Sequence, residues 1–248
     1  MLISVVITTY KRPLLLRRAL QSIDFSINDL DVIVIDDDEK MSGTAIVSEF
    51  NGVRYFAKRG TCRGLSISRN IGIDLSCGKY IIFLDDDDYF EKNTIKIFLQ
   101  NIDGFNSFFY CNYINVNKNS KNYFSQKEVL RHKLLVGNTI PIGSYMIEKS
   151  SIKNKFDSAM KSHEDWEFLL KNINWDKSKY LDNNSVYIDK TSEGDNSMQN
   201  RRRKMFWLDY LHIYSKYPND ELAQQRSLVL SQLGVNVPPE LLHFSNEH

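Results

Sequence analysis

The chain has 248 residues, of which 42% are hydrophobic and 25% are charged, and its 32 basic and 31 acidic side chains give a formal net charge of +1. This composition excludes disordered, collagen-like and disulfide-stapled chains, and the near-neutral charge argues against a surface that coats nucleic acid. The length fits one large domain with an appendage, and we expect an ordinary water-soluble globular protein.

The first half of the chain carries four short runs rich in β-branched residues, and each predicts a buried strand. The runs are nearly continuous in apolar residues, which favours parallel strands covered by helices on both faces. Between them, Pro13 marks the start of a helix, and Gly78 is placed to end another helix that follows Gly64. Repeated β-α-β units are therefore expected. The four predicted strands are residues 3–8, 32–35, 53–56 and 80–84.

The second half predicts a mixed continuation of strands and helices, separated by polar loops rich in Asn and Lys. Ser162 stands three residues before Asp165, which is typical of a helix N-cap, so a helix should begin at about Ser162. Two more helices are expected, from 201 to 218 and from 220 to 233. The predicted strands of this half are residues 107–116, 142–147 and 186–188.

Two of the predicted strands end in acids, with three consecutive Asp at 36–38 and four at 85–88. Because the carboxyl ends of parallel strands meet at one edge of a sheet, both groups should face one crevice. Carboxylates about 4 Å apart repel by roughly 4 kcal/mol at an effective dielectric near 20, so a bound cation is expected. Oxygen ligands without His or Cys indicate Mg²⁺ or Mn²⁺, which bridge acids to substrate phosphates. The alternative is that each Asp run is a solvated turn.

Other acid-rich phosphate enzymes fit the sequence less well. A receiver domain would place acids after its first strand, but that strand here ends in Thr8, Thr9 and Tyr10. A sugar nucleotidyltransferase needs a Gly-rich loop at this point, and the next three residues, Lys11-Arg12-Pro13, contain no glycine. The sequence also lacks a Walker-type loop.

Five segments stand in an order that is typical of one enzyme family: 4–12, 34–37, 64–72, 78–89 and 156–170. They resemble the nucleotide loop, the base-binding acidic turn, the helix before the metal motif, the Asp-x-Asp segment and the catalytic-base segment of the inverting family 2 glycosyltransferases. The resemblance implies an α/β chain with a GT-A-type fold, a Rossmann-like mixed sheet flanked by helices, and a helical C-terminal extension. It assigns 1–198 to the GT-A domain (1–100 nucleotide-binding, 101–198 acceptor-binding) and 199–248 to the extension.

The resemblance also implies roles for individual residues. Asp85 and Asp87 would hold Mn²⁺ or Mg²⁺, with Asp86 beside the ribose or the donor. Asp165 would be the general base that takes a proton from the acceptor hydroxyl, although near the start of a helix it can equally serve as a capping acid. The other implied substrate-binding residues are Thr8 and Tyr10 (base and ribose), Asp37 (uracil ring), Arg69 or Arg63 (diphosphate), Arg12 and Glu164.

The sequence departs from the family pattern at three places. Thr8 stands where many relatives have Pro, and Asp38-Glu39 replaces a common Gly-Ser pair, which adds charge near the nucleotide. Residues 188–191 replace an Arg-x-His-like segment, so Lys190 would supply positive charge there in place of a histidine metal contact. The following loop, 193–197, is expected to become ordered when the donor binds.

These features favour a metal-dependent inverting glycosyltransferase. It would move a sugar from a nucleotide-diphospho-sugar, a UDP-hexose or UDP-N-acetylhexosamine, to a hydroxyl of a glycan or lipid-linked glycan acceptor. The resemblance places this reaction in bacterial surface polysaccharide synthesis. The alternative is a catalytically silent module of the same fold that binds a nucleotide or a glycan, and the presence of Asp85, Asp87 and Asp165 favours the enzyme.

The sequence favours a cytoplasmic location, because its three cysteines lack paired spacing and its first residues lack the basic start of a signal peptide. A basic quartet at 201–204 precedes aromatic residues at helical spacing. This segment predicts either a helix packed on its own domain or a peripheral contact with the cytoplasmic face of the inner membrane. A nucleic-acid partner is not expected from so small a basic cluster.

Overall fold

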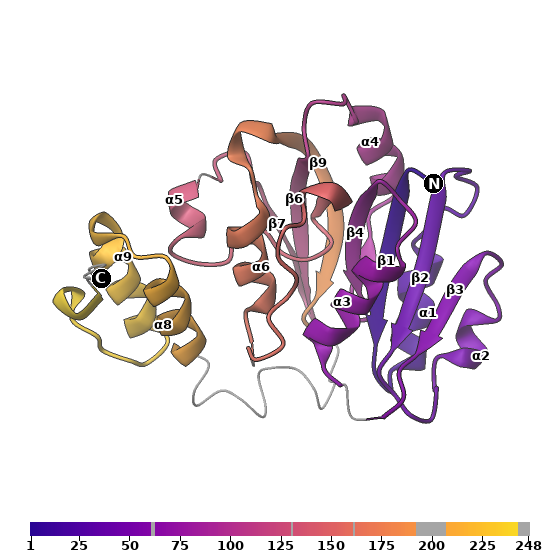
Figure 1. Ribbon diagram of the computed structural model, residues 1–248, viewed down its shortest axis with the longest axis horizontal. Helices are drawn as coiled ribbons and strands as arrows, with labels where there is room; N and C mark the ends of the chain where they lie inside the picture. Colours follow the sequence, from indigo (N-terminus) through magenta and orange to yellow (C-terminus); the bar gives the residue numbers. More distant parts are fainter. Residues whose placement is uncertain (61–62, 130, 161, 192–206, 243–248) are drawn as a thin grey trace.

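A mixed β-sheet with helices on both faces forms the centre of the molecule (Figure 1). The computed structural model describes residues 1–60, 63–129, 131–160, 162–191 and 207–242. Within these residues the sheet has nine strands in the order β3-β2-β1-β4-β8-β6-β9-β5, with β7 paired to β6. The expected mixed sheet flanked by helices is therefore confirmed.

The first four strands form the parallel half of the sheet, as their apolar sequences predict. They are β1 (Ile3–Thr9), β2 (Leu30–Asp36), β3 (Val53–Ala57) and β4 (Tyr80–Asp85). The prediction of a buried strand is wrong for β3, which lies at the edge of the sheet and alternates between half-buried and exposed residues. The crossovers contain α1 (Pro13–Gln21), the short α2 (Thr44–Val47) and α3 (Leu65–Leu75). Pro13 occupies the first turn of α1, where its missing N–H has no helical partner to lose.

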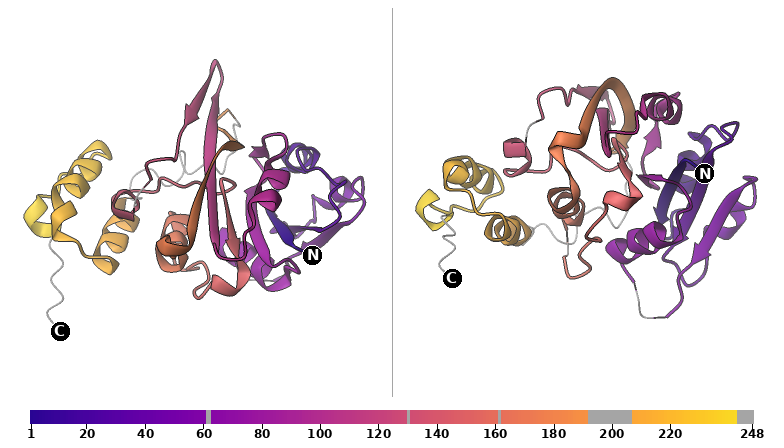
Figure 2. Two further views of the ribbon diagram at one scale, coloured as in Figure 1. Left: turned by 90° about the horizontal axis from the view of Figure 1, so that it is seen from above. Right: turned by 45° about the horizontal axis from the view of Figure 1, so that its top comes forward.

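The second half of the sheet contains strands of both directions. They are β5 (Tyr89–Phe90), β6 (Phe108–Asn117), β7 (Ser120–Phe124), β8 (Tyr145–Glu148) and β9 (Ser178–Asp189). The strand predicted at 186–188 is the end of the much longer β9, and the short strands β5 and β7 were not predicted. The β6–β7 hairpin extends beyond the rest of the sheet (Figure 2). Helices α4 (Thr94–Asn101), α5 (Arg131–Leu134) and α6 (Glu164–Asn172) complete this half.

Two apolar cores fill the space between the sheet and its helices. On one face, Ile73 of α3 and Phe168 of α6 belong to one buried cluster. On the other face, Leu20 of α1 and Phe98 of α4 belong to a second one. The strands supply side chains to both clusters, since successive residues of a strand point to opposite faces. The carboxyl ends of β1 and β4 are thereby held in a rigid frame.

The start of α6 differs from the prediction. The helix begins at Glu164, and its N-cap is His163 in the left-handed conformation (φ 57°), so Ser162 is not the cap. Asp165 consequently occupies the second helical position. The cause is tertiary packing. The His163 ring lies 4.7 Å from the Tyr210 ring, and the Ser162 hydroxyl donates to Asp209, which is 47 residues further along the chain.

The expected C-terminal helices are present as α8 (Trp207–Lys216) and α9 (Ala223–Gln232). Tyr210 lies 5.0 Å from the Trp166 ring, and the Tyr214 hydroxyl donates to the Val136 carbonyl at 2.7 Å. The interpretation that these aromatic residues pack on their own domain is therefore confirmed. The basic quartet and the loop 193–197 lie outside the described residues.

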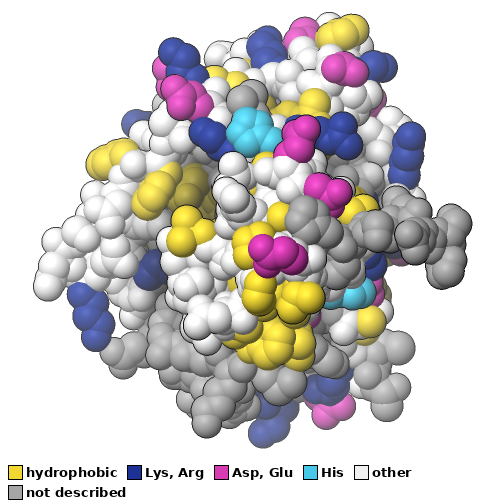
Figure 3. Space-filling view, turned by 90° about the vertical axis from the view of Figure 1, so that its left-hand side faces the viewer, with side chains coloured by type: hydrophobic (Ala, Val, Ile, Leu, Met, Phe, Trp, Pro, Cys, Tyr) yellow, Lys and Arg dark blue, Asp and Glu magenta, His cyan; other side chains and the backbone are white. Residues whose placement is uncertain are grey.

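The outer face of the C-terminal helices shows hydrophobic side chains among charged ones (Figure 3). Leu228 of α9 is 61% exposed. No helix in the described ranges combines the length and apolar character that crossing a bilayer requires.

Candidate active site

The two acidic strand ends meet at one edge of the sheet, as predicted. In the strand register, Thr9 of β1 pairs with Asp36 on one side, and its neighbour Thr8 pairs with Asp85 on the other. Asp36 itself is fully buried, and its carboxylate accepts hydrogen bonds from the Gly43 amide (2.9 Å) and the Tyr55 hydroxyl (2.7 Å). Asp36 therefore fixes the turn.

Asp37 directly follows β2, and its side chain contacts the start of α3. Its carboxylate pairs with Lys58 Nζ at 2.8 Å and accepts a 2.8 Å hydrogen bond from the Gly64 amide. Gly64 has a φ of 113°, which a side chain would disfavour. Nearby, the half-exposed Arg63 pairs with Glu39. The role of Asp37 toward a uracil ring stays a prediction, as does that of Arg63 toward a diphosphate.

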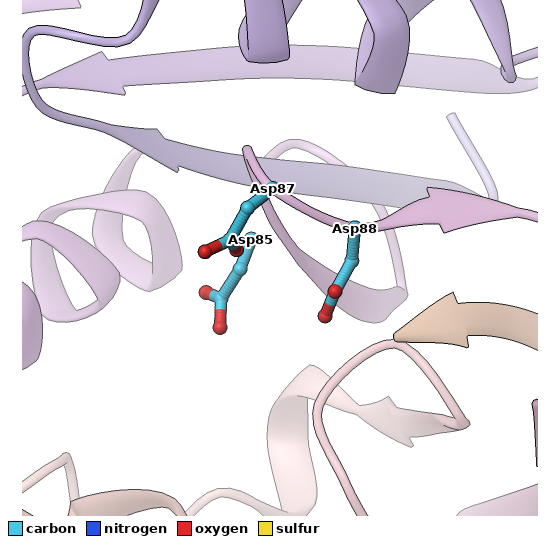
Figure 4. Close-up of side chains that lie close together, drawn as sticks. All are labelled: Asp85, Asp87 and Asp88. Atoms are coloured by element: carbon cyan, nitrogen blue, oxygen red, sulfur yellow. The ribbon is translucent and has the colours of Figure 1, made fainter. Parts of the chain in front are cut away.

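Three acids of the β4–β5 turn form a cluster that can hold a cation. Asp85, Asp87 and Asp88 each offer a carboxylate oxygen within 4.8 Å of the others, and their side chains point to the same side of the turn (Figure 4). The side chains of Asp85 and Asp87 are 27% and 29% exposed, so a ligand can reach them. Asp88 was not among the predicted metal ligands, although it stands in the same acidic run.

The electrostatics of this cluster suit a divalent cation. Burial and the Asp85 carboxylate raise the pKa of Asp87, and burial together with both neighbours raises the pKa of Asp88 well above its ordinary value. Each shift shows that the negative charges disfavour one another when no cation is bound. An all-oxygen donor set is the kind that Mg²⁺ and Mn²⁺ prefer, so the residues fit the expected metal.

Asp86 is not a member of this cluster and is fully buried. Its carboxylate accepts a 2.7 Å hydrogen bond from the Thr9 hydroxyl and pairs with Arg12, whose Nη1 also lies 2.7 Å from Asp87 Oδ2. Burial raises the pKa of Asp86 to about 7, although Arg12 opposes the shift. Asp86 thus orients Arg12 beside the cluster, and its contact with a ribose stays a prediction.

Arg69 links the acidic turn to α6. It is buried, and it donates to Asp85 at 2.9 Å and to Glu164 at 2.8 Å. Burial alone would lower the pKa of Arg69, but Asp85 and Glu164 raise it above its ordinary value. Arg69, Asp85 and Glu164, which were predicted as site residues with separate roles, are therefore brought together in one ion-pair chain.

Asp165 lies at the start of α6, next to this chain. Its Oδ2 accepts a 2.7 Å hydrogen bond from the Asn138 side chain, and its Oδ1 accepts one from the Trp166 amide at 2.8 Å. Burial raises the pKa of Asp165, while Arg69 opposes the shift. A carboxylate held in this way can act as a general base toward a hydroxyl within hydrogen-bond reach. Asn138 gave no signal in the sequence, because it comes from a loop 27 residues away.

The end of β9 closes the site on its other side. The Asp189 amide donates to Asp88 Oδ1 at 3.0 Å, so the exposed Lys190 follows directly beside the acidic turn. Thr8 is buried, with its hydroxyl 3.4 Å from Asp85, and Tyr10 is partly exposed under Lys11. The segments predicted to form the donor site thus lie at one edge, and the individual contacts with substrate stay predictions.

Sequence comparisons identify relatives of the chain. The model of the family described as Glycosyl transferase family 2 matches residues 4–170. An uncharacterized glycosyltransferase of Rickettsia conorii is 33% identical over 56% of this chain and 23% of its own length. The GalNAc(5)-diNAcBac-PP-undecaprenol beta-1,3-glucosyltransferase of Campylobacter jejuni is 29% identical over 40% of this chain and 33% of its own. The minor teichoic acid biosynthesis protein GgaB of Bacillus subtilis is 26% identical over 86% of this chain and 26% of its own. The chain thus spans a third or less of the length of these relatives.

A solved structure, that of S. aureus TarS residues 1–349 in complex with UDP-GlcNAc, is similar with a TM-score of 0.72. The two chains are 21% identical, and the match covers 93% of this chain and 72% of that one. The expected GT-A-type fold is thereby confirmed.

Proposed function

The chain belongs to glycosyl transferase family 2, and from this premise we propose that it is a metal-dependent inverting enzyme that uses a UDP-sugar donor. The observation that carries the proposal is the meeting of three carboxylate groups within 4.8 Å at the end of β4, linked through Arg69 to the start of α6. In this proposal, the three carboxylates are a cation site, and Asp165 at the start of α6 is the general base beside it.

Each residue has a chemical role in this proposal. A divalent cation held by Asp85, Asp87 and Asp88 would supply positive charge against the diphosphate of the leaving nucleotide. Arg12, which is partly exposed beside Asp87, adds a second positive charge. Asp165 accepts the proton of the acceptor hydroxyl as the oxygen attacks the anomeric carbon. The bond to the nucleotide breaks on the opposite side, so a single displacement inverts the anomeric centre.

The choice of donor and acceptor is supported by relatives. TarS has been crystallised with UDP-GlcNAc and with UDP, which favours a UDP-hexose or UDP-N-acetylhexosamine here. The names of the Campylobacter and Bacillus relatives refer to an undecaprenol-linked glycan and to teichoic acid. We therefore propose a glycan or lipid-linked glycan as acceptor, and a bacterial surface polysaccharide as the product.

The proposal also includes the division of the chain into domains and the location of the protein. We propose that residues 1–198 act as the catalytic domain, with donor contacts in 1–100 and acceptor contacts in 101–198, and that 199–248 form a C-terminal extension. We propose a cytoplasmic location, with contact at the inner membrane when a lipid-linked acceptor is used.

Incubation of the protein with UDP-glucose, UDP-galactose and UDP-N-acetylhexosamines in the presence of Mn²⁺ tests the proposal. We expect release of UDP from one donor, loss of this release in an Asp87→Ala variant, and an inverted linkage in the product by NMR once an acceptor is found. If UDP binds but no donor is ever consumed, the alternative of a silent nucleotide-binding module is favoured.

A further inference from the structure

Arg18 of α1 makes two polar contacts at the acidic turn. One end of its guanidinium, Nη2, donates to the backbone carbonyl of Asp87, and the other end, Nη1, pairs with the Asp189 carboxylate. Asp87 belongs to the turn after β4, and Asp189 is the last residue of β9. One side chain therefore joins two segments that are about a hundred residues apart in the sequence.

The turn after β4 carries the cation cluster, and the end of β9 is hydrogen-bonded to it. The Asp189 amide donates to Asp88 Oδ1, so a displacement of β9 would move the hydrogen bond that orients Asp88. The other Asp189 carboxylate oxygen accepts hydrogen bonds from the Thr191 amide (2.7 Å) and hydroxyl (2.6 Å). Asp189 is thus fixed on both oxygens, and Arg18 connects it to the carbonyl of Asp87.

The face of the guanidinium is also fixed. Its carbon lies 4.8 Å from the centre of the Tyr89 ring, and Tyr89 stacks on Tyr187 with centroids 4.7 Å apart and an angle of 16°. Lys121 of the β6–β7 hairpin lies 4.9 Å from the centre of the Tyr187 ring. Two cations and two rings therefore connect α1 with the hairpin, and Arg18 has little freedom to move.

We propose that Arg18 is a positioning residue for the cation site: by joining the Asp87 carbonyl to Asp189, it sets how far apart the Asp87 and Asp88 carboxylates are held. This inference rests on the proposed function, because it assumes that the cluster binds a divalent cation. Arg18 itself touches neither substrate nor metal in this role. A guanidinium suits the task, because its planar fork holds two donors in a fixed geometry, whereas a lysine ammonium is a compact charge on a flexible stem.

The neighbouring residue provides a matched control. Arg17 also lies on α1 and also forms a bidentate ion pair, with Glu49, but this pair is solvent-exposed and lies among residues without a proposed role. Arg17→Ala therefore removes a similar charge and a similar ion pair from the same helix without touching the cluster.

Binding of Mn²⁺ alone, measured from the electron paramagnetic resonance signal of the free ion, tests the inference. Thermal unfolding of the same samples reports folding. We expect Arg18→Ala to weaken Mn²⁺ binding about tenfold or more, the loss typical when a group that orients metal ligands is removed. Arg18→Lys should fall between parent and Arg18→Ala, and Arg17→Ala should bind Mn²⁺ like the parent.

The outcomes separate this inference from the proposed function. If the parent binds Mn²⁺ and both Arg18 variants bind it equally well, Arg18 is a structural residue only and the inference is wrong. A lower unfolding temperature with unchanged Mn²⁺ affinity leads to the same conclusion. If the parent itself binds no Mn²⁺, the metal-dependent function is wrong, and the inference falls with it. Should Arg18→Ala fail to fold, Arg18→Lys against Arg17→Ala decides the question.

Discussion

The Asn138 amide donates a 2.7 Å hydrogen bond to Oδ2 of Asp165, and this bond joins the loop before β8 to the start of α6. The Asp165 carboxylate also accepts a hydrogen bond from the Trp166 amide. Both donors favour the charged form of the acid, in opposition to burial, which raises its pKa. Asn138 therefore tunes the proposed general base.

Asn138→Ala should shift the pH dependence of transfer. Asp165 works as a base only when it is deprotonated, so the rate falls as the pH decreases through its pKa. Loss of the Asn138 donor raises this pKa further, and we expect the acidic limb of the kcat/KM profile to move to higher pH. Asn122→Ala, on the exposed β7 strand, is the control and should leave the profile in place. An unshifted profile for Asn138→Ala would mean that the acidic limb does not report the titration of Asp165.

Asp165→Asn should abolish transfer while nucleotide binding stays intact. The amide keeps the shape of the side chain but cannot take the proton from the hydroxyl of the acceptor substrate. General-base catalysis contributes about 100-fold to 10,000-fold in rate. UDP affinity from calorimetry and kcat from UDP release measure the two effects separately. Asp176→Asn changes an exposed acid and should have no effect on either. Full activity in Asp165→Asn would remove this residue from the base role.

Much of this site follows from sequence because parallel strands leave little freedom. The runs before Asp36 and Asp85 are apolar and continuous, which predicts strands of one parallel sheet with their carboxyl ends at one edge; β1 lies between them. The contacts among Arg18, Asp88 and Asp189 could not be predicted from the sequence. They depend on β9, a polar strand whose pairing with β6 shifts register at Asn112, and no local pattern reports such a shift.

The start of α6 also could not be predicted correctly from the local sequence. Ser162 has the right side chain and spacing for an N-cap, yet His163 caps the helix in a left-handed conformation. The Ser162 hydroxyl bonds instead to Asp209, which lies in α8 and is remote in sequence. A contact between two distant helices thus overrides a local preference.

Asp86 should make the stability of the metal-free protein depend on pH. In the folded chain its pKa is about 7, whereas an unfolded aspartate has a pKa of about 4. Between about pH 4 and pH 7 the folded state binds more protons than the unfolded state. The free energy of unfolding therefore decreases as the pH rises, by as much as about 4 kcal/mol. Urea unfolding at several pH values with a chelator present measures this. Asp86→Asn removes the titration and should flatten the curve, and equal slopes in both proteins would contradict the assignment.

Tyr214 should contribute to the stability of the whole chain through α8. Tyr214→Phe removes the hydrogen bond to the Val136 carbonyl, and we expect a loss of about 1 kcal/mol in the free energy of unfolding. Tyr214→Ala also removes a buried ring and should cost about 3 to 5 kcal/mol. Denaturant unfolding checks both, with Leu228→Ala on the exposed side of α9 as the neutral control. Unchanged stability in Tyr214→Ala would mean that α8 does not pack on the domain in solution.

The central claim is that the Asp85, Asp87 and Asp88 cluster binds a divalent cation that a nucleoside diphosphate needs. Calorimetric titration of UDP, with GDP and dTDP alongside, tests it most directly in buffers containing either Mn²⁺ or a chelator. We expect UDP to bind preferentially, at least about tenfold tighter with Mn²⁺ than with the chelator, and the difference to disappear in Asp87→Ala but not in Asp176→Asn. UDP binding that is equally tight with and without Mn²⁺, or that Asp87→Ala leaves unchanged, would contradict the claim.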